Sequence, residues 1–149
     1  MPERLPGAVL FACTMNAVRS VMAEALMKHL LGHRVYVDSA GVRTGEEIDP
    51  FVISVMDEIG IDVTRHHSKS FDDLEDSSFD LIVSLSPEAQ HSAVEMTRTM
   101  ACEVEYWPTL DASIVEGSRE QRLNAYREVR DQLMRKIEKR FSLDLKPQV

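Results

Sequence analysis

The stretch that decides the fold of this chain is Val9-Leu10-Phe11-Ala12-Cys13-Thr14-Met15-Asn16-Ala17-Val18-Arg19-Ser20-Val21-Met22-Ala23-Glu24-Ala25-Leu26. Its apolar run ends at Cys13, and a helical spacing of apolar residues begins just after Arg19, so it predicts a buried strand, a turn and a helix. A cysteine at this junction lies beside backbone N–H groups that have no partner within the helix. Those groups and the positive end of the helix favour the thiolate form of a cysteine.

The turn has the spacing Cys-x5-Arg-Ser, which suits a loop that closes around a tetrahedral oxyanion. Backbone N–H groups would surround the anion, and the guanidinium of Arg19 would hold two of its oxygens. We therefore predict Cys13 as a nucleophile and Arg19 as the cation that binds the anion, with Ser20 donating its hydroxyl group to the sulfur. The predicted phosphate-binding residues are Thr14, Met15, Asn16, Ala17, Val18, Arg19 and Ser20. The alternative is that Cys13 is a buried core residue and Arg19 a solvated helix residue.

Strand and helix patterns alternate along the rest of the chain. The predicted strands cover residues 8–12, 35–37, 80–85 and 103–107, and the predicted helices cover residues 19–31, 50–60, 87–100 and 118–140. This alternation predicts an α/β fold in three layers, with a four-stranded parallel sheet flanked by helices and the Cys13 loop between the first strand and the first helix. The length of 149 residues suits one domain over residues 1–149.

The carboxyl edge of such a sheet is where ligands bind, and Cys13, Ser39 and residues 108–115 all fall there. A carboxylic acid in the last of these segments would reach over the Cys13 loop and protonate a leaving oxygen. Asp111 is the residue that we predict for this role of general acid. The alternative is an aspartate that only caps a turn ahead of the last helix.

Composition excludes several classes of protein. The net charge of −8 argues against a nucleic-acid surface. No apolar run suits a signal peptide or approaches the roughly 20 residues of a membrane span, so we expect a cytoplasmic protein with no membrane partner, and a monomer by default. Cys13 and Cys102 have no metal-ligand spacing, so no metal and no other cofactor is predicted. The basic residues of the last helix are interleaved with glutamates, as on a solvated face.

The motif Val-Leu-Phe-x-Cys-x-x-Asn-x-x-Arg-Ser-x-Met-Ala-Glu-Ala closely resembles the low-molecular-weight protein tyrosine phosphatases and their arsenate-reductase relatives. The resemblance continues through Asp38-Ser39-Ala40-Gly41, Asp49-Pro50, residues 60–69 and Phe79-Asp80-Leu81-Ile82-Val83, and it covers residues 7–140. It implies a hydrolase in which the loop after the first strand is the phosphatase loop. It also implies that Ser39 and His66 support this loop by hydrogen bonds to Asn16.

A member of this family would act by double displacement without a metal ion. Cys13 would attack phosphorus while Asp111 gives a proton to the leaving oxygen, and water would then cleave the cysteinyl phosphate. The implied partner is a phosphorylated protein, with phosphotyrosine first, or a small phosphate ester.

The chain departs from the family pattern around the mouth of the loop. Met15 stands where most relatives have glycine, Ala112 follows Asp111 where proline is common, and residues 42–47 lack the usual aromatic side chain. Two alternatives therefore stay open: an arsenate reductase, or a phosphate-dependent binding or regulatory module with little turnover. Against the first, the thioredoxin-coupled reductases need further cysteines, residues 84–100 contain none, and Cys102 is interpreted as a core residue.

Overall fold

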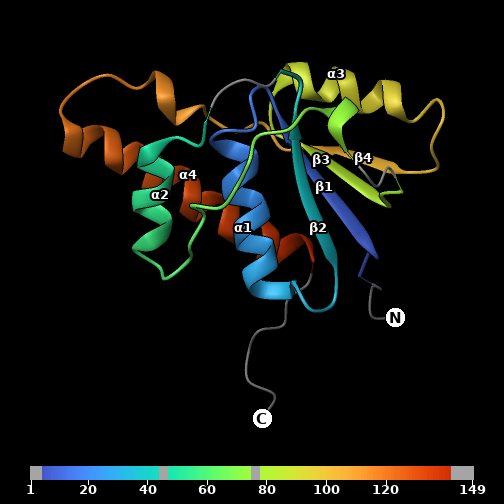
Figure 1. Cartoon of the computed structure of the whole chain (residues 1–149), viewed down its shortest axis with the longest axis horizontal. Coiled ribbons are helices and arrows are strands. Elements are labelled where there is room, and N and C mark those ends of the chain that lie inside the picture. The colour runs from blue at the N-terminus through green and yellow to red at the C-terminus, as the bar shows by residue number, and fades with distance from the viewer. Residues whose placement is uncertain (1–4, 44–46, 75–77, 142–149) are drawn as a thin grey trace, which may run out of the picture.

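Four parallel strands form the centre of the protein in the computed structural model, which describes residues 5–43, 47–74 and 78–141 (Figure 1). The strands are β1 (Ala8–Cys13), β2 (Tyr36–Gly41), β3 (Leu81–Ser84) and β4 (Glu103–Tyr106), in the spatial order β2-β1-β3-β4. Cys13, at the end of β1, is in register with Gly41. Every residue of β1 and β3 is buried, because helices cover both faces of a parallel sheet, and this explains why the two strands are almost wholly apolar.

Helices cover the sheet on both sides. α1 (Arg19–Leu31), α2 (Pro50–Asp57) and α4 (Arg119–Arg140) lie on one face, and α3 (Pro87–Met96) lies on the other (Figure 1). Two short 3-10 helices, η1 (Phe71–Asp73) and η2 (Ala112–Ile114), are also present. The predicted three-layer α/β fold with a four-stranded parallel sheet is therefore confirmed. In the described part of the chain, no helix combines the length and the apolar character that crossing a bilayer requires.

The side chains of β1 alternate between two cores. Val9 and Phe11 belong to the larger core, which β1 shares with α1 and α4, whereas Leu10 belongs to the smaller core beneath α3. Phe11 is fully buried, and its ring centroid lies 6.1 Å from that of Trp107. Burial of a side chain of this size stabilises a fold by about 2–3 kcal/mol. This packing holds in place the strand that ends at Cys13.

β2 is longer than the sequence predicted. The expected strand covered residues 35–37, but the structure continues it to Gly41. The polar residues of the extension do not break the strand, because the Asp38 carboxylate lies 2.8 Å from the Lys69 ammonium and Ser39 has hydrogen bonds inside the fold. The extension brings Ser39 beside the Cys13 loop.

Two helices are shorter than the sequence predicted. α2 ends at Asp57, and the turn that follows passes through Gly60, whose φ of 79° lies outside the helical region. α3 ends at Met96 rather than at residue 100, and residues 97–100 form turns. In both places the apolar periodicity runs past the last helical turn, so it does not mark the boundary.

Candidate active site

The sulfur of Cys13 lies at the end of β1, where the loop of residues 14–18 begins. Cys13 is 2% exposed. Its Sγ atom is 2.9 Å from the hydroxyl oxygen of Ser20 and accepts a hydrogen bond from the backbone N–H of Asn16 at 3.3 Å. Both groups can donate to a negatively charged sulfur, which is the form in which cysteine acts as a nucleophile.

Asn16 braces the loop from within, and it is fully buried. Its φ of 55° lies in the left-handed region, which asparagine tolerates better than most residues. Its amide group donates to Ser20 Oγ at 2.8 Å and to Ser39 Oγ at 2.9 Å. Its Oδ1 accepts from Nε2 of His66 at 3.1 Å and from the backbone N–H of Lys69 at 3.0 Å. Because the Ser20 oxygen already accepts from Asn16, the Ser20 hydroxyl hydrogen is available to the sulfur.

The backbone of the loop packs directly against the end of β2. The N–H of Val42 donates to the Cys13 carbonyl at 3.1 Å, and the N–H of Arg43 donates to the Thr14 carbonyl at 2.9 Å. A Cβ atom at Gly41 would lie 2.8 Å from backbone atoms of the loop, which is too close for any side chain. Glycine is therefore required at this position for the strand and the loop to approach each other.

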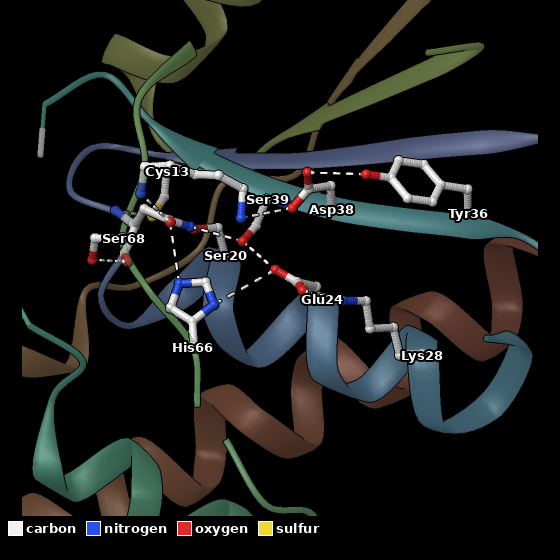
Figure 2. A network of polar contacts seen from close by, with 11 residues as sticks. Cys13, Ser20, Glu24, Lys28, Tyr36, Asp38, Ser39, His66 and Ser68 are labelled. Carbon is white, nitrogen blue, oxygen red and sulfur yellow. Dashed lines mark hydrogen bonds and ion pairs between the residues drawn. The ribbon is translucent and has the colours of Figure 1, made fainter. Parts of the chain in front are cut away.

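A buried carboxylate for which the sequence predicts no role extends this network. Glu24 lies one turn after Ser20 on α1, is 8% exposed, and accepts the hydroxyl hydrogen of Ser39. Figure 2 shows it between two nitrogen-bearing side chains: Lys28 Nζ lies 2.5 Å from its Oε2, and His66 Nδ1 lies 3.7 Å from its Oε1. Burial lowers the pKa of His66, and the Glu24 carboxylate opposes this shift. The spacing of four residues between Ser20 and Glu24 could have indicated this contact region, because it puts both side chains on one helix face.

Arg19 is the first residue of α1, and its side chain reaches the ends of the neighbouring strands. Its Nη1 donates to the Thr109 carbonyl at 3.2 Å and to the Leu85 carbonyl at 3.5 Å. Its Nη2 lies 3.9 Å from Oδ2 of Asp111, and the side chain is 11% exposed. These contacts hold the guanidinium beside Asp111.

Asp111 caps a turn and faces Arg19 at the same time. Its Oδ1 accepts from the backbone N–H of Ser113 at 3.0 Å and from the Ser113 hydroxyl at 2.6 Å, as the N-cap of η2. Its Oδ2 is left to face Arg19. Asp111 therefore has both roles: it caps the turn, as in the alternative interpretation, and its carboxylate also faces Arg19. Because Ala112 stands where proline is common in the family, hydrogen bonds from Ser113, rather than a proline ring, set the direction of this carboxylate.

A cavity of about 710 Å³ brings Cys13, Arg19 and Asp111 together. Although residues 42–47 contain no aromatic side chain, Phe51 at the start of α2 supplies an aromatic ring to the same cavity. The other predicted loop residues that line it are Met15, Ala17 and Val18. Thr14, Asn16 and Ser20 do not line it. The hydroxyl of Thr14 donates to Ser86 Oγ at 3.0 Å. Within the described residues, no group of three or more histidine, cysteine, aspartate or glutamate side chains is placed to hold a metal ion.

The second cysteine lies at the amino end of the strands, whereas Cys13 lies at their carboxyl end. Cys102 is half-buried and directly precedes Glu103, which is in register with Leu81, and Leu81 is in register with Val9. Cys102 is therefore level with the start of β1, whereas Cys13 is at its end. Five residues of strand span about 16 Å, and a disulfide needs Cα atoms within about 7 Å of each other. The two cysteines cannot pair in this fold.

Comparisons with known proteins identify the family and the fold of this chain. The family model for low molecular weight phosphotyrosine protein phosphatases matches residues 8–147. An arsenate reductase of Halalkalibacterium halodurans is 33% identical over 130 residues, which are 87% of this chain and 91% of that protein. A low molecular weight protein tyrosine phosphatase from T. tengcongensis matches with a TM-score of 0.74 at 26% identity, over 91% of this chain and 97% of that one. The YwlE arginine phosphatase, solved with a phosphorylated active-site serine, matches with a TM-score of 0.72 at 25% identity, over 92% and 97% of the two chains.

Proposed function

Because this chain belongs to the low molecular weight phosphotyrosine protein phosphatase family, we propose that it is a cysteine-dependent phosphatase that hydrolyses phosphomonoesters, protein phosphotyrosine among them, through a cysteinyl-phosphate intermediate. One observation carries the proposal: Cys13, Arg19 and Asp111 line a single cavity at the carboxyl edge of the sheet. A nucleophile, a cation for the phosphoryl oxygens and a proton donor are the groups that this reaction needs.

In the first step, the thiolate of Cys13 attacks phosphorus in line with the leaving oxygen. Asp111 gives its proton to that oxygen, so the alcohol or phenol departs without charge. Arg19 and the backbone N–H groups of the loop hold the other phosphoryl oxygens and stabilise their charge. In the second step, Asp111 takes a proton from water, which attacks the cysteinyl phosphate and releases inorganic phosphate and the thiolate. The scheme needs no metal ion.

The residues around Asn16 act as positioning residues in this scheme. Ser20 donates to the sulfur at 2.9 Å and so stabilises the thiolate when it leaves in the second step. Ser39 and His66 act through the Asn16 side chain, and Glu24 extends their network along α1. These contacts fix the loop before an anion binds, so less free energy is spent on ordering its backbone N–H groups during the reaction.

The partners and location that we propose follow from the same chemistry. The substrate is a phosphorylated protein or a small phosphate ester, and inorganic phosphate and similar oxyanions compete for the loop. A cytoplasmic location suits the nucleophile, because a reducing compartment keeps a thiol such as Cys13 free. A monomer remains our expectation.

The curated relatives favour a second candidate, arsenate reduction, because they are named arsenate reductases and arsenate has the shape and charge of phosphate. Cys13 would attack arsenic with loss of water, and a second thiol would then attack the Cys13 sulfur. Two thiols would end as a disulfide, and arsenic would leave as arsenite, reduced by two electrons. Since Cys102 lies at the other edge of the sheet, the second thiol would have to come from another molecule.

Hydrolysis of para-nitrophenyl phosphate without added metal, between about pH 5 and pH 7, tests the proposal. We expect no turnover by Cys13→Ser and a loss of about 100-fold or more by Asp111→Asn. Cys102→Ser is the matched control and should keep full activity. Turnover that survives in Cys13→Ser would contradict the proposal. Vanadate binding without turnover would favour a binding module, and arsenate-dependent oxidation of an added thiol in the absence of hydrolysis would favour the reductase.

A further inference from the structure

We propose that Phe51, Arg119 and Arg122 form a specificity subsite in the active-site cavity, and that this subsite binds an acidic side chain next to the phosphorylated residue of a peptide substrate. The three residues line the same cavity as Cys13 and Asp111. This inference rests on the proposed phosphatase function and names the class of substrate that the site would prefer.

The aromatic ring of the subsite is held firmly in place. Phe51 follows Pro50, and its backbone N–H donates to the Asp49 carboxylate at 2.8 Å. The hydroxyl group of Tyr126 donates to the other oxygen of Asp49 at 2.5 Å, and the rings of Phe51 and Tyr126 lie 5.2 Å apart. These bonds tie the start of α2 to α4, so the ring does not have to be ordered when a substrate arrives.

Two guanidinium groups lie over this ring. The Cζ atom of Arg122 is 4.6 Å from the ring centroid of Phe51, and that of Arg119 is 5.4 Å from it. The two arginines are three residues apart on α4, so they share one face of the helix. Stacking on an aromatic ring fixes the direction of a guanidinium but leaves the N–H groups at its edge able to donate to an anion.

Other arginines of α4 have carboxylate partners. Arg127 and Arg130 both form ion pairs with Glu58, at 2.7 Å and 2.9 Å. Among the described residues, no carboxylate lies within ion-pair distance of Arg119 or Arg122.

The acidic groups of the cavity are already engaged or exposed. Asp49 accepts from Phe51 and Tyr126, Asp111 faces Arg19, and Glu47 is exposed. None of these three carboxylates forms an ion pair with Arg119 or Arg122, so the edges of both guanidinium groups can donate to an anion that the substrate brings.

The size of the cavity indicates where that anion comes from. A phosphoryl group alone fills only a small part of about 710 Å³, so the remaining space can hold the rest of the phosphorylated side chain and a neighbouring residue. Glutamate or aspartate beside the phosphorylated residue would place a carboxylate near Arg119 and Arg122, and the phosphorylated side chain would contact Phe51.

The test uses two peptides that carry phosphonomethyl-phenylalanine, which mimics phosphotyrosine and is not hydrolysed. One peptide has glutamate on both sides of this residue and the other has glutamine. We expect the glutamate peptide to inhibit para-nitrophenyl phosphate hydrolysis about fivefold more strongly than the glutamine peptide, with a smaller difference at high salt. The double variant Arg119→Gln, Arg122→Gln should remove the difference, and the double lysine variant should keep part of it. Arg135→Gln removes the same type of charge from an exposed position of α4 outside the cavity and should leave the difference intact.

The outcomes separate this inference from the proposed function. Equal inhibition by the two peptides in the wild type, or a difference that survives in the double glutamine variant, would overturn the subsite. A wild type that does not hydrolyse para-nitrophenyl phosphate would overturn the phosphatase, and calorimetric binding of the same two peptides would then still test the subsite. If carboxybenzylphosphonate binds more tightly than benzylphosphonate through the two arginines while the peptides do not differ, the source of the anion is a small ester and the peptide assignment is wrong.

Discussion

The inside of the Cys13 loop and the subsite of Phe51, Arg119 and Arg122 are built in opposite ways. Inside the loop, the buried Asn16 side chain has four hydrogen bonds, and no buried polar side-chain atom of the described residues lacks a partner. In the subsite, Arg119 and Arg122 stack on an aromatic ring, and neither forms an ion pair with a carboxylate of the described residues.

This difference separates the chemistry from the choice of substrate. A fully bonded network keeps its geometry when the substrate changes, so the loop should hold any phosphoryl group in the same way. Side chains that keep free donors respond to what the substrate carries beside that group. Changes inside the loop should therefore lower kcat, and changes in the subsite should mainly alter KM.

Among the variants that test this difference, Asn16→Ala should have the largest effect. The change leaves Ser20, Ser39, His66 and the Lys69 N–H without their shared partner, and it places alanine at a φ of 55°. We expect a loss of about 3 kcal/mol in the free energy of unfolding, measured in urea, and a fall of about 100-fold in kcat.

Asn16→Gly is the matched control, because glycine accepts the left-handed backbone but has no side chain. It should be more stable than Asn16→Ala by about 1 kcal/mol, with a similarly low kcat. A kcat close to that of the wild type in either variant would show that the network does not control the chemistry.

The approach of β2 to the loop gives a second test. In Gly41→Ala the new Cβ meets loop backbone at 2.8 Å, so we expect a loss of about 1–3 kcal/mol in stability and a lower kcat. Gly60→Ala is the comparison: its φ of 79° strains alanine by about 1 kcal/mol, but no atom lies within 4 Å of the new Cβ. It should lose stability and keep full activity. Equal activity of the two variants would argue against the loop contact.

The pH dependence of stability tests the network at His66, with a smaller effect. Burial lowers the pKa of His66, so the unfolded chain binds more protons than the folded chain as the pH falls below about 6.5. The free energy of unfolding should therefore decrease as the pH falls through this value. His66→Gln, which keeps a donor for Asn16, should lack this component. His67→Gln changes an exposed neighbour and should keep this pH dependence. If His67→Gln also lost it, the pH dependence would not come from His66.

The smallest effect should come from Phe51→Leu. Leucine keeps an apolar contact but loses the aromatic face on which Arg119 and Arg122 stack. We expect KM for para-nitrophenyl phosphate to rise about threefold with kcat unchanged, as measured by steady-state kinetics. Phe51→Tyr keeps the ring and should behave like the wild type. A fall in kcat instead of a rise in KM would place the ring within the catalytic geometry.

Most of the fold could be predicted from the sequence, because its strongest signals are local. The helix predicted over residues 19–31 has those bounds in the structure, since its apolar spacing and its junction with Cys13 lie within one segment. The end of β2 could not be predicted, because Asp38 and Ser39 look like turn residues until partners from other segments satisfy them.

The candidate site divides in the same way. Cys13, Arg19 and Ser20 belong to one short motif, so their arrangement follows from the turn between a strand and a helix. The placement of Asp111 needed the topology, because it faces Arg19 only when β1 and β4 end at the same edge of the sheet. The sequence did not predict a role for Glu24, because a glutamate on a helix is usually solvated; here Ser39 of β2 and His66 contact its carboxylate, and the residue is buried.

The sequence by itself determined the Cys13 loop of this protein and the sheet that carries it, because the backbone N–H groups, the cysteine and the arginine of the loop lie within a few residues of one another. The tertiary structure alone decided what surrounds the loop. Glu24 meets Ser39 and His66, and Phe51 meets Arg119 and Arg122, across separations in sequence that no local pattern encodes. Such contacts depend on how helices and strands pack into shared cores, and that packing gives every polar side chain of the buried network a partner, while Arg119 and Arg122 stack on Phe51 without an ion pair to the described residues.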